Sequence, residues 1–580
     1  NKYWRKCSEL KLDPNLQKHY LPINYVKSAS SASTPVRIIL DPSQKGKNSI
    51  SLNHCEASGS SQIGDLKGCL LRFRTSQTVA LGDIAKFFNS FGLTDEDMSL
   101  RRILIPEKRF GQKGEDIKLE EYALTVMGFG DKASPILATI GKMKHMKAFI
   151  NETEEELKES VTRTLTTQAY VDDCFANCPY GEDIKKITNA VDRILTKGNM
   201  SIKQWIYGNN TETTKYLGYL WNPNEDSMHV KCWFNSGKKI RGESIEDNLD
   251  LDNVTLLSKS FSRRKVLRIQ GQFFDPLLIL SPIVVKIRLL FQKVCMEQED
   301  IDWDSPLKEE LQDAVVDLYK DLAQYKDFEF RRSVIPREMA GHRPRCELIT
   351  FTDGSLSAYA ACSYLRFKQG NQIFSNLLVS TVKISGARKL TPPRSELLGA
   401  HAGVQLALQV KKEISDNVEI TSVTYITDSR VILAQLKLKS ASFEVFTGSR
   451  IAFIQDHSAD SRWLWCPGKD NPADLPTRNL TTYEEVTSEK WMNGGFLLKE
   501  EKDWPTKSLS EADLETMKPT KNALYTAKML VRATQAMENE EQITETNFSS
   551  LLKRHRSFQK VINIISYMLK LRYTNLPFAD

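Results

Sequence analysis

The sequence lacks any apolar stretch long enough to cross a membrane. Its most apolar run, residues 273–285, contains two prolines and is shorter than the roughly 20 residues that a spanning helix needs. The first twenty residues are mixed and charged, without the apolar segment of a secretory signal. We therefore expect no membrane segment, no export and an intracellular protein.

Several site signatures are also missing. The ten cysteines are scattered, without a CxxC pair or a Cys/His set at zinc-ligand spacing, which argues against a zinc site and indicates reduced thiols. The triplets Asp-Thr-Gly and Asp-Ser-Gly do not occur, which argues against an aspartic protease. Strong charge is absent too, because 80 basic and 73 acidic residues leave a net charge of +7. That balance is only a weak indication of a polyanionic partner.

The composition is that of a large globular protein. The 580 residues are 41% hydrophobic and 26% charged, and this length predicts roughly three to five domains. Up to about residue 221, short β-rich runs mix with helices, including a helix expected from Asp83 onward in DIAKFFNSF. Residues 236–253 are polar and without periodicity, which predicts a linker.

The second half changes its pattern. Residues 254–300 carry basic and apolar residues in helical rhythm, and we expect the next helix to begin at Ser305, as N-cap, and Pro306. From residue 346 a strand, a helix, a strand and a helix follow one another, which predicts an α/β layer. The whole is therefore predicted to be a multi-domain protein with α+β and α/β parts.

Two adjacent aspartates stand in the stretch YVDD at 170–173. Strand-like residues flank them, which predicts that Asp172 and Asp173 lie at or near the bend of a hairpin. Asp83 follows the apolar run TVALG, and we expect it to lie beside Asp172. Converging carboxylates favour Mg²⁺ or Mn²⁺, and two such ions support in-line phosphoryl transfer. An isolated Asp-Asp pair, however, is more often only a polar turn.

Four more carboxylates form a second set, Asp353, Glu396, Asp428 and Asp474. Asp353 and Asp428 each end a predicted strand, and Glu396 lies near the start of an amphipathic helix. Asp474 opens or precedes another helix. This placement predicts that the first three converge at one sheet edge, where paired divalent ions would activate water for phosphodiester hydrolysis. Taken singly, each residue is explained as well by a turn or a helix start.

The order of the motifs adds a family resemblance. The stretches VRIILDPS with SLN, ALGDIAKFF, MGFGDKASP, YVDD, KYLGYLW and GQFFDPLLILSPIVVKIRLLFQ follow one another along the chain. In this order they resemble the reverse transcriptases of Pao (Bel-Pao) class LTR retrotransposons. The later stretches TDGS, SELLGA, TDS and WLWCPGKDNPADLPTR resemble the ribonuclease H domain of such elements.

The resemblance covers about residues 20–495. It implies a right-hand polymerase of fingers, palm and thumb, followed by a ribonuclease H-like mixed-sheet domain. The implied division is 1–235 for fingers and palm, 236–345 for a mainly helical thumb and connection, 346–490 for the ribonuclease H-like domain, and 491–580 for a spacer leading toward an integrase.

The resemblance also implies roles for single residues. Asp83 and Asp172, supported by Asp173, would hold two Mg²⁺ or Mn²⁺ ions in the polymerase site. The second set of carboxylates would hold two ions in the nuclease site. For substrate binding the implied residues are Arg37 at the triphosphate, Phe88 against the ribose 2′-hydroxyl, Phe129 and Gly130 under the template base and incoming nucleotide, and Gly218 in the hairpin that grips the primer. A buried core aromatic is the alternative for Phe88.

Two departures from the family pattern stand out. No lysine matches the second triphosphate-binding residue well, Lys27 being the nearest. Gly468 and Lys469 stand where retroviral-type domains often carry a mobile histidine. Lys469 and Trp465 are candidates for contact with the substrate backbone, a core role being the alternative for Trp465. The basic residues expected to face phosphates in the thumb are Lys259, Arg263, Arg264, Lys265 and Arg268.

The implied activity is RNA-directed DNA polymerisation with hydrolysis of the RNA strand of the hybrid. The implied partners are an RNA template, a DNA primer, the RNA–DNA hybrid and deoxynucleoside triphosphates. Cytoplasmic virus-like particles are the implied location, with nuclear entry, dimerisation and association with other polyprotein products left open. The competing hypotheses are a catalytically decayed or domesticated nucleic-acid-binding remnant, and a structural protein whose motifs are accidental.

Overall fold

The computed structural model describes residues 3–27, 36–57, 59, 62–106, 118–178, 183–231, 261–297, 302–339, 343–386, 390–478 and 481–508. The chain forms two compact units, residues 1–437 with 450–514 and residues 438–449 with 515–580. The predicted linker at 236–253 and residues 509–580 of the predicted C-terminal spacer lie outside the described residues. The helices and strands described below belong to the first unit, except that residues 445–449 at the start of one helix belong to the second. Among the described residues, no helix combines the length and the hydrophobicity that a membrane crossing requires.

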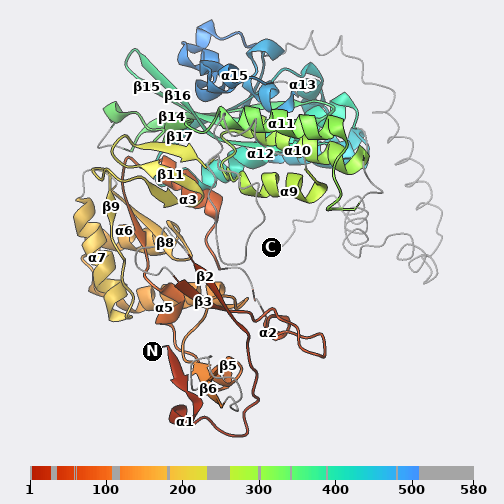
Figure 1. Cartoon of the computed structure of the whole chain (residues 1–580). Coiled ribbons are helices and arrows are strands. Elements are labelled where there is room, and N and C mark those ends of the chain that lie inside the picture. Colours follow the sequence, from red (N-terminus) through yellow and green to blue (C-terminus); the bar gives the residue numbers. More distant parts are fainter. Residues whose placement is uncertain are drawn as a thin grey trace, which may run out of the picture. The chain divides into compact units, whose positions relative to one another are not determined.

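The first part of the chain combines small antiparallel sheets with helices (Figure 1). A four-stranded sheet has the order β7-β8-β4-β9, and a core of apolar side chains from the neighbouring helices packs against it. The strands of that sheet are β4 (Thr78–Asp83), β7 (Ala169–Tyr170), β8 (Asp173–Cys178) and β9 (Ile206–Tyr207). The helices are α5 (Ser134–Phe149), α6 (Glu155–Leu165) and α7 (Ile184–Lys197).

Helix α7 shows why these helices form. Asp183 caps its N-terminus by accepting a hydrogen bond from the amide of Lys185. Ile187, Val191 and Ile194 recur at helical spacing and are buried in the core, so one face packs while the other meets solvent. The apolar face of α7 therefore packs against the sheet that carries Asp173.

Three further small sheets complete this part. One has the order β1-β6-β5, one is the pair β2-β3, and one has the order β10-β11-β12-β13. Their strands are β1 (Trp4–Lys6), β2 (Ile23–Lys27), β3 (Val36–Leu40), β5 (Arg102–Pro106), β6 (Leu119–Leu124), β10 (Thr214–Tyr216), β11 (Tyr219–Asn222), β12 (Ser227–Val230) and β13 (Glu329–Arg331). Short helices connect them, namely α1 (Cys7–Leu10), α2 (Leu52–Cys55), α3 (Leu66–Arg74) and α4 (Asp95–Ser99).

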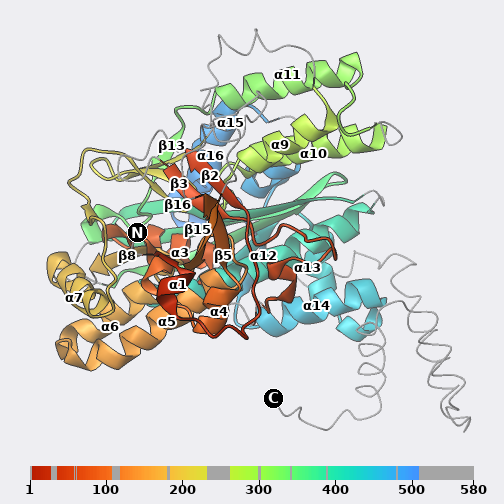
Figure 2. The ribbon, with the colours of Figure 1, turned by 60° about the horizontal axis from the view of Figure 1, so that its bottom comes forward.

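The middle of the chain is helical, as predicted, with α9 (Arg263–Gln272), α10 (Ser281–Glu297) and α11 (Glu309–Ala323) lying together (Figure 2). The predicted start at Ser305 and Pro306 was wrong. The helix begins at Glu309 after Lys308, because Pro306 forms an antiparallel bridge with Ser262 and the amide of Leu307 donates to the Phe261 carbonyl. A backbone engaged in strand-like pairing cannot begin a helix.

A five-stranded mixed sheet dominates the later part. Its order is β16-β15-β14-β17-β18, antiparallel among the first three strands and parallel among the last three. The strands are β14 (Arg345–Gly354), β15 (Ala358–Gln369), β16 (Gln372–Ile384), β17 (Glu419–Thr427) and β18 (Arg462–Trp465). The helices are α12 (Pro392–Ile414), α13 (Arg430–Lys437), α14 (Val445–His457), α15 (Tyr483–Thr487) and α16 (Glu489–Asn493).

Helices cover both faces of this sheet. The side chain of Val285 on α10 packs with Ala360 of β15, whereas Gly403 of α12 lies against Ala361. Neighbouring strand residues point to opposite faces, so α10 and α12 lie on opposite sides. The α+β first part and this mixed sheet confirm the predicted fold class. The division of the chain into four domains stays a prediction, and α10, predicted as thumb, contributes to the core of the mixed-sheet part.

Candidate metal centres

Two carboxylates of the second set lie at the same edge of the mixed sheet. Asp353 is the penultimate residue of β14, and Asp428 directly follows the last residue of β17. The two strands are parallel neighbours with Thr352 opposite Thr427. Because parallel strands in register end at the same edge, the two aspartates become neighbours there. The sequence prediction of converging strand ends is confirmed.

The third carboxylate comes from α12, which approaches β14 unusually closely. A Cβ atom on Gly399 would lie 2.3 Å from the carbonyl oxygen of Asp353, and one on Gly354 would lie 2.3 Å from the carbonyl carbon of Ser395. Only glycine permits such an approach of two backbones. The helix can therefore place Glu396 beside the strand end. From the sequence we did not identify Gly399 as the contact point between α12 and β14, although a glycine inside an apolar helical stretch indicates close packing.

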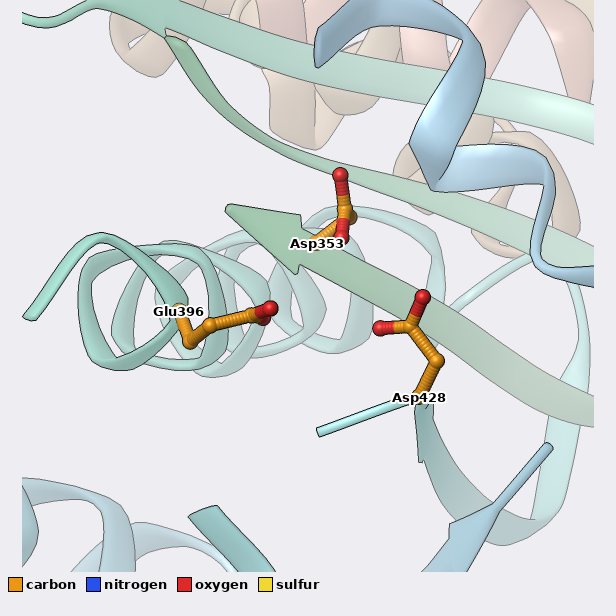
Figure 3. A group of neighbouring side chains, drawn as sticks. All are labelled: Asp353, Glu396 and Asp428. Atoms are coloured by element: carbon orange, nitrogen blue, oxygen red, sulfur yellow. The ribbon is translucent and has the colours of Figure 1, made fainter. Parts of the chain in front are cut away.

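The three carboxylates form one compact group (Figure 3). One oxygen each of Asp353, Glu396 and Asp428 lies within 4.8 Å of the others. Glu396 Oε2 and Asp428 Oδ1 are buried and accept no hydrogen bond. Buried oxygen acceptors normally have partners, and hard oxygen ligands suit divalent ions such as Mg²⁺. The donor set therefore fits a metal site.

Burial and mutual repulsion change the acidity of this group. Burial, then the charge of Asp428, raises the pKa of Asp353 to about 7. Burial, then the charges of Asp353 and Asp428, raises the pKa of Glu396 to about 9. Burial also raises the pKa of Asp428. Carboxylates this close repel one another when ionised, and a divalent cation held between them would relieve that repulsion.

Asp474, the predicted fourth member, lies outside the compact group. It belongs to the 3₁₀ helix η6 (Pro472–Thr477), and its carboxylate forms an ion pair with Arg478. Its charge nevertheless adds to the raised pKa of Asp353, after burial and the charge of Asp428, whereas the hydrogen bond from Thr477 lowers that pKa. A metal-binding role for Asp474 stays a prediction.

Neighbouring side chains hold two of the acids in place. The hydroxyl of Thr477 donates to Asp353 Oδ2, and the Trp465 indole donates to the Asp428 carbonyl oxygen over 2.9 Å. The guanidinium of Arg430 lies 4.5 Å from the centroid of the Trp465 ring. Trp465 thus has a structural role next to the site, and its predicted contact with substrate stays a prediction.

The position without the expected histidine has a steric explanation. A Cβ atom on Gly468 would lie 2.9 Å from Asp428 Oδ2, so a side chain there would press on the carboxylate. The carbonyl of the next residue, Lys469, accepts a hydrogen bond from Lys490 Nζ over 2.6 Å. The glycine therefore leaves room for the acidic group, and the predicted substrate contact of Lys469 stays a prediction.

The first set of carboxylates lies on the β7-β8-β4 part of the smaller sheet. Tyr170 pairs with Asp173, so Val171 and Asp172 form a two-residue turn, which confirms the predicted hairpin. Asp83 ends β4 opposite Asp173. The expected helix from Asp83 was wrong, because this residue completes a strand and only the short 3₁₀ helix η1 (Phe87–Ser90) follows.

These carboxylates are arranged more loosely. Burial, then the charges of Asp172 and Asp83, raises the pKa of Asp173 to about 7, and burial raises the pKa of Asp172. Lys203 Nζ lies 2.7 Å from Asp83 Oδ1, with both side chains about half exposed. Within the part of the chain that the structure describes, three possible metal-ligand atoms lie within 4.8 Å of one another only in the group around Asp353. The sequence did not reveal Lys203.

The predicted substrate-binding residues are partly brought together. The rings of Phe88 and Phe129 meet edge to face, with centroids 5.2 Å apart, and Phe129 is 42% exposed. Gly130 has φ +106, and a Cβ atom there would lie 2.8 Å from the Leu40 carbonyl oxygen. Gly218 lies in the turn between β10 and β11 at φ +100. Arg37 belongs to β3, but its side chain lies outside the described residues.

The basic residues at the start of α9 are not all available to phosphates. Arg264 is paired with Asp304, at 2.7 Å, and the Arg263 guanidinium lies 5.4 Å from the centroid of the Trp303 ring. Lys259 lies outside the described residues. Contact between this segment and nucleic acid stays a prediction.

The mixed sheet, the helix that crosses it and the three acids together form an α/β part of the chain. Residues 262–429 match the family model of the Pao retrotransposon-like RNaseH-like domain. The chain thus contains a Pao retrotransposon-like segment, which confirms the resemblance for these residues. No curated protein matches the chain.

Three solved structures of foamy viral protease-reverse transcriptases are also similar. Each alignment covers 80% of this chain. The first structure, designated dRH, contains double-stranded DNA and has 12% identity and a TM-score of 0.46. The second contains an RNA/DNA hybrid, with 14% identity and a TM-score of 0.45, and the third contains double-stranded DNA, with 13% identity and a TM-score of 0.46. This chain spans 66%, 51% and 79% of their respective lengths. Because all three TM-scores are below 0.5, these similarities assign no function to this chain.

Proposed function

We propose that the chain is an RNA-directed DNA polymerase with a ribonuclease H site. The observation that carries its nuclease part is the convergence of Asp353, Glu396 and Asp428, with two buried oxygens that accept no hydrogen bond. Its polymerase part is supported by the pairing of Asp83 with Asp173 beside the YVDD turn. That arrangement suits hydrolysis of a phosphodiester by a two-metal site. The family match of the surrounding residues points to the same class of chemistry.

In the nuclease site the acids would hold two Mg²⁺ or Mn²⁺ ions. Such ions, when bound, lower the pKa of water and neutralise charge on the leaving oxygen. The chain itself orients the acids: Thr477 fixes one carboxylate oxygen of Asp353, and Trp465 fixes the backbone at Asp428. Gly468 keeps the space beside Asp428 free of a side chain. Asp474 would join after leaving Arg478.

In the polymerase site Asp83, Asp172 and Asp173 would hold the ions that serve nucleotidyl transfer. The raised pKa of Asp173, caused first by burial, is the electrostatic support for a cation between these acids. Phe88 and Phe129, which touch one another, would border the incoming nucleotide and the template base. Gly130 and Gly218 would let nucleic acid approach the backbone closely, and Arg37 would meet the triphosphate.

The proposed substrates are an RNA template with a DNA primer, deoxynucleoside triphosphates and the RNA–DNA hybrid. Recognition of the hybrid would depend on helix shape and 2′-hydroxyls, so little sequence preference is expected. The location in cytoplasmic virus-like particles and the association with other copies or other polyprotein products belong to the same proposal.

Two matched variants test both sites in one tube. Wild type, Asp172→Asn and Asp353→Asn receive an RNA template, a labelled DNA primer, deoxynucleotides and Mg²⁺, and extension and RNA cleavage are followed together. Asp172→Asn should cut RNA without extending the primer, and Asp353→Asn should extend without cutting. Loss of both activities in either variant would contradict two separate sites.

A second candidate function is that of a nucleic-acid-binding remnant without polymerase activity. The ion pair between Lys203 and Asp83 favours it, because the lysine ammonium contacts a carboxylate that would bind a metal ion in a polymerase site. Under this alternative the wild type binds hybrid duplex in a salt-sensitive manner but neither extends nor cuts.

A further inference from the structure

Helix α5 carries a lysine on its buried face. Lys142 stands one helical turn from Ala138 on one side and from Met146 on the other, and both neighbours belong to the apolar core. The lysine is only 2% exposed. An amine in such surroundings is unfavourable unless a polar group receives its hydrogen bonds, so this position needs a specific partner.

The partner of Lys142 is the backbone of the YVDD turn. Its Nζ donates to the Val171 carbonyl oxygen over 3.0 Å and lies 5.3 Å from the centroid of the Phe87 ring. Val171 has φ +56, which a β-branched residue rarely adopts. A strained conformation persists only where its surroundings hold it. The lysine supplies such a hold from the core side.

The other side of the turn is fastened as well. The amide of Ile84, which follows Asp83, donates to the Asp172 carbonyl oxygen over 2.9 Å. Successive carbonyls of the turn are thus held by α5 and by the end of β4. We propose that Lys142 is a positioning residue that keeps Val171 at positive φ, so that Asp172 and Asp173 stand beside Asp83. This inference rests on the proposed polymerase function.

The substitution Lys142→Met tests the inference, because methionine fills similar space and cannot donate the hydrogen bond. Replacing a buried polar group with an apolar one of similar volume commonly preserves stability. We expect kcat of primer extension to fall roughly 10- to 100-fold, as misplacement of reacting groups does. The KM for deoxynucleotide, RNA cleavage and the melting temperature should stay near wild type. Lys144→Met, an exposed change on the same helix, is the matched control.

A second variant separates the hydrogen bond from the charge. Lys142→Gln keeps an uncharged donor, so it should recover part of the extension lost in Lys142→Met. Val171→Gly supplies a residue that adopts positive φ without strain. The double variant Lys142→Met/Val171→Gly should therefore lose less extension activity than the two single losses added together, because both residues act on the same backbone conformation.

Binding of Mn²⁺ provides a readout that needs no catalysis. The parent chain carries Asp353→Asn, which removes an acid of the compact group. This chain is titrated with Mn²⁺ alone, and binding of the ion by Asp83, Asp172 and Asp173 is measured. Lys142→Met should weaken that binding several-fold, whereas Lys144→Met should not. If wild type does not extend a primer, but Mn²⁺ binding still weakens in Lys142→Met, the polymerase proposal fails while the positioning role stands.

Three results would overturn the positioning role. One is wild-type extension and Mn²⁺ binding in Lys142→Met. The second is a joint loss of extension, RNA cleavage and thermal stability in both Lys142 variants, which would make the lysine a general structural residue. The third is the absence of any Mn²⁺ binding at these aspartates in the parent Asp353→Asn chain.

Discussion

The two sets of carboxylates are built on different kinds of strand connection. Around Asp353, two parallel strands end at the same edge and a helix crosses them closely, so acids from three elements meet in one buried group. At YVDD, antiparallel strands and a tight turn bring the acids side by side, and a lysine pairs with the outermost one. In this chain the acids are compact where a helix crosses two parallel strands, and looser where antiparallel strands and a turn meet.

Replacing a member of the compact group should have the largest effect. Glu396→Gln removes a buried ligand and should lower RNA cleavage by about 100-fold or more, with primer extension nearly unchanged. Asp474→Asn should cost less, because that carboxylate is paired with Arg478 outside the group. The cleavage rates of both variants on a labelled hybrid test this. Equal losses would show that Asp474 leaves Arg478 and joins the acids during catalysis.

The helix crossing should be nearly as sensitive. In Gly399→Ala the added methyl group meets the Asp353 carbonyl 2.3 Å away, so α12 must move and carry Glu396 with it. We expect a loss of about 1–3 kcal/mol in the free energy of unfolding. RNA cleavage should fall roughly 10- to 100-fold. Gly386→Ala, where nothing lies within 4 Å of the new atom, is the control for denaturant unfolding and cleavage. Wild-type behaviour of Gly399→Ala would refute the close crossing.

The compact group should also give the chain a distinctive pH dependence. The pKa values of about 7 for Asp353 and about 9 for Glu396 lie above those of unfolded carboxyl groups, so the folded chain binds these protons more tightly. Their contribution to stability is therefore complete below about pH 4 and is lost as pH rises toward about 9. Ions bind the ionised acids, so Mg²⁺ should raise the melting temperature more at about pH 8.5 than at about pH 5.5.

The variant Asp353→Asn is the control for that experiment. With one carboxyl replaced, the metal-free chain should lose less stability between the two pH values, and Mg²⁺ should raise the melting temperature less. A stabilisation by Mg²⁺ that is independent of pH and of Asp353 would place the bound ion elsewhere.

The smallest effect is expected at the looser site. Lys203 and Asp83 are both about half exposed, and such an ion pair contributes at most about 1 kcal/mol. Lys203→Met should therefore lower the Mg²⁺ concentration for half-maximal primer extension by no more than about fivefold. Extension at stepped Mg²⁺ concentrations measures this, with Lys197→Met, another partly exposed ion-paired lysine, as the control. A higher Mg²⁺ requirement would show that Lys203 assists the site.

Local patterns predicted the parts of these sites that depend on neighbours in the chain. The hairpin at Asp172 and the strand ends at Asp353 and Asp428 followed from alternation and turn chemistry. The helix expected from Asp83 was wrong because pairing with β8 draws that residue into a strand, which no local signal reports. The helix start at Ser305 failed for the same reason, since its neighbour Pro306 pairs with Ser262.

The sequence by itself determined which residue types stand at strand ends and turns, and thus the two sets of acids and the fold class. Only the tertiary structure decided that Asp474 pairs with Arg478 outside the compact group, that Asp83 lies opposite Asp173, and that Lys142 bonds to Val171. A lysine inside a helix is normally solvated, so its burial cannot be read from spacing. Hydrogen bonds and backbone approaches between distant segments depend on packing of the whole chain, which local periodicity does not encode.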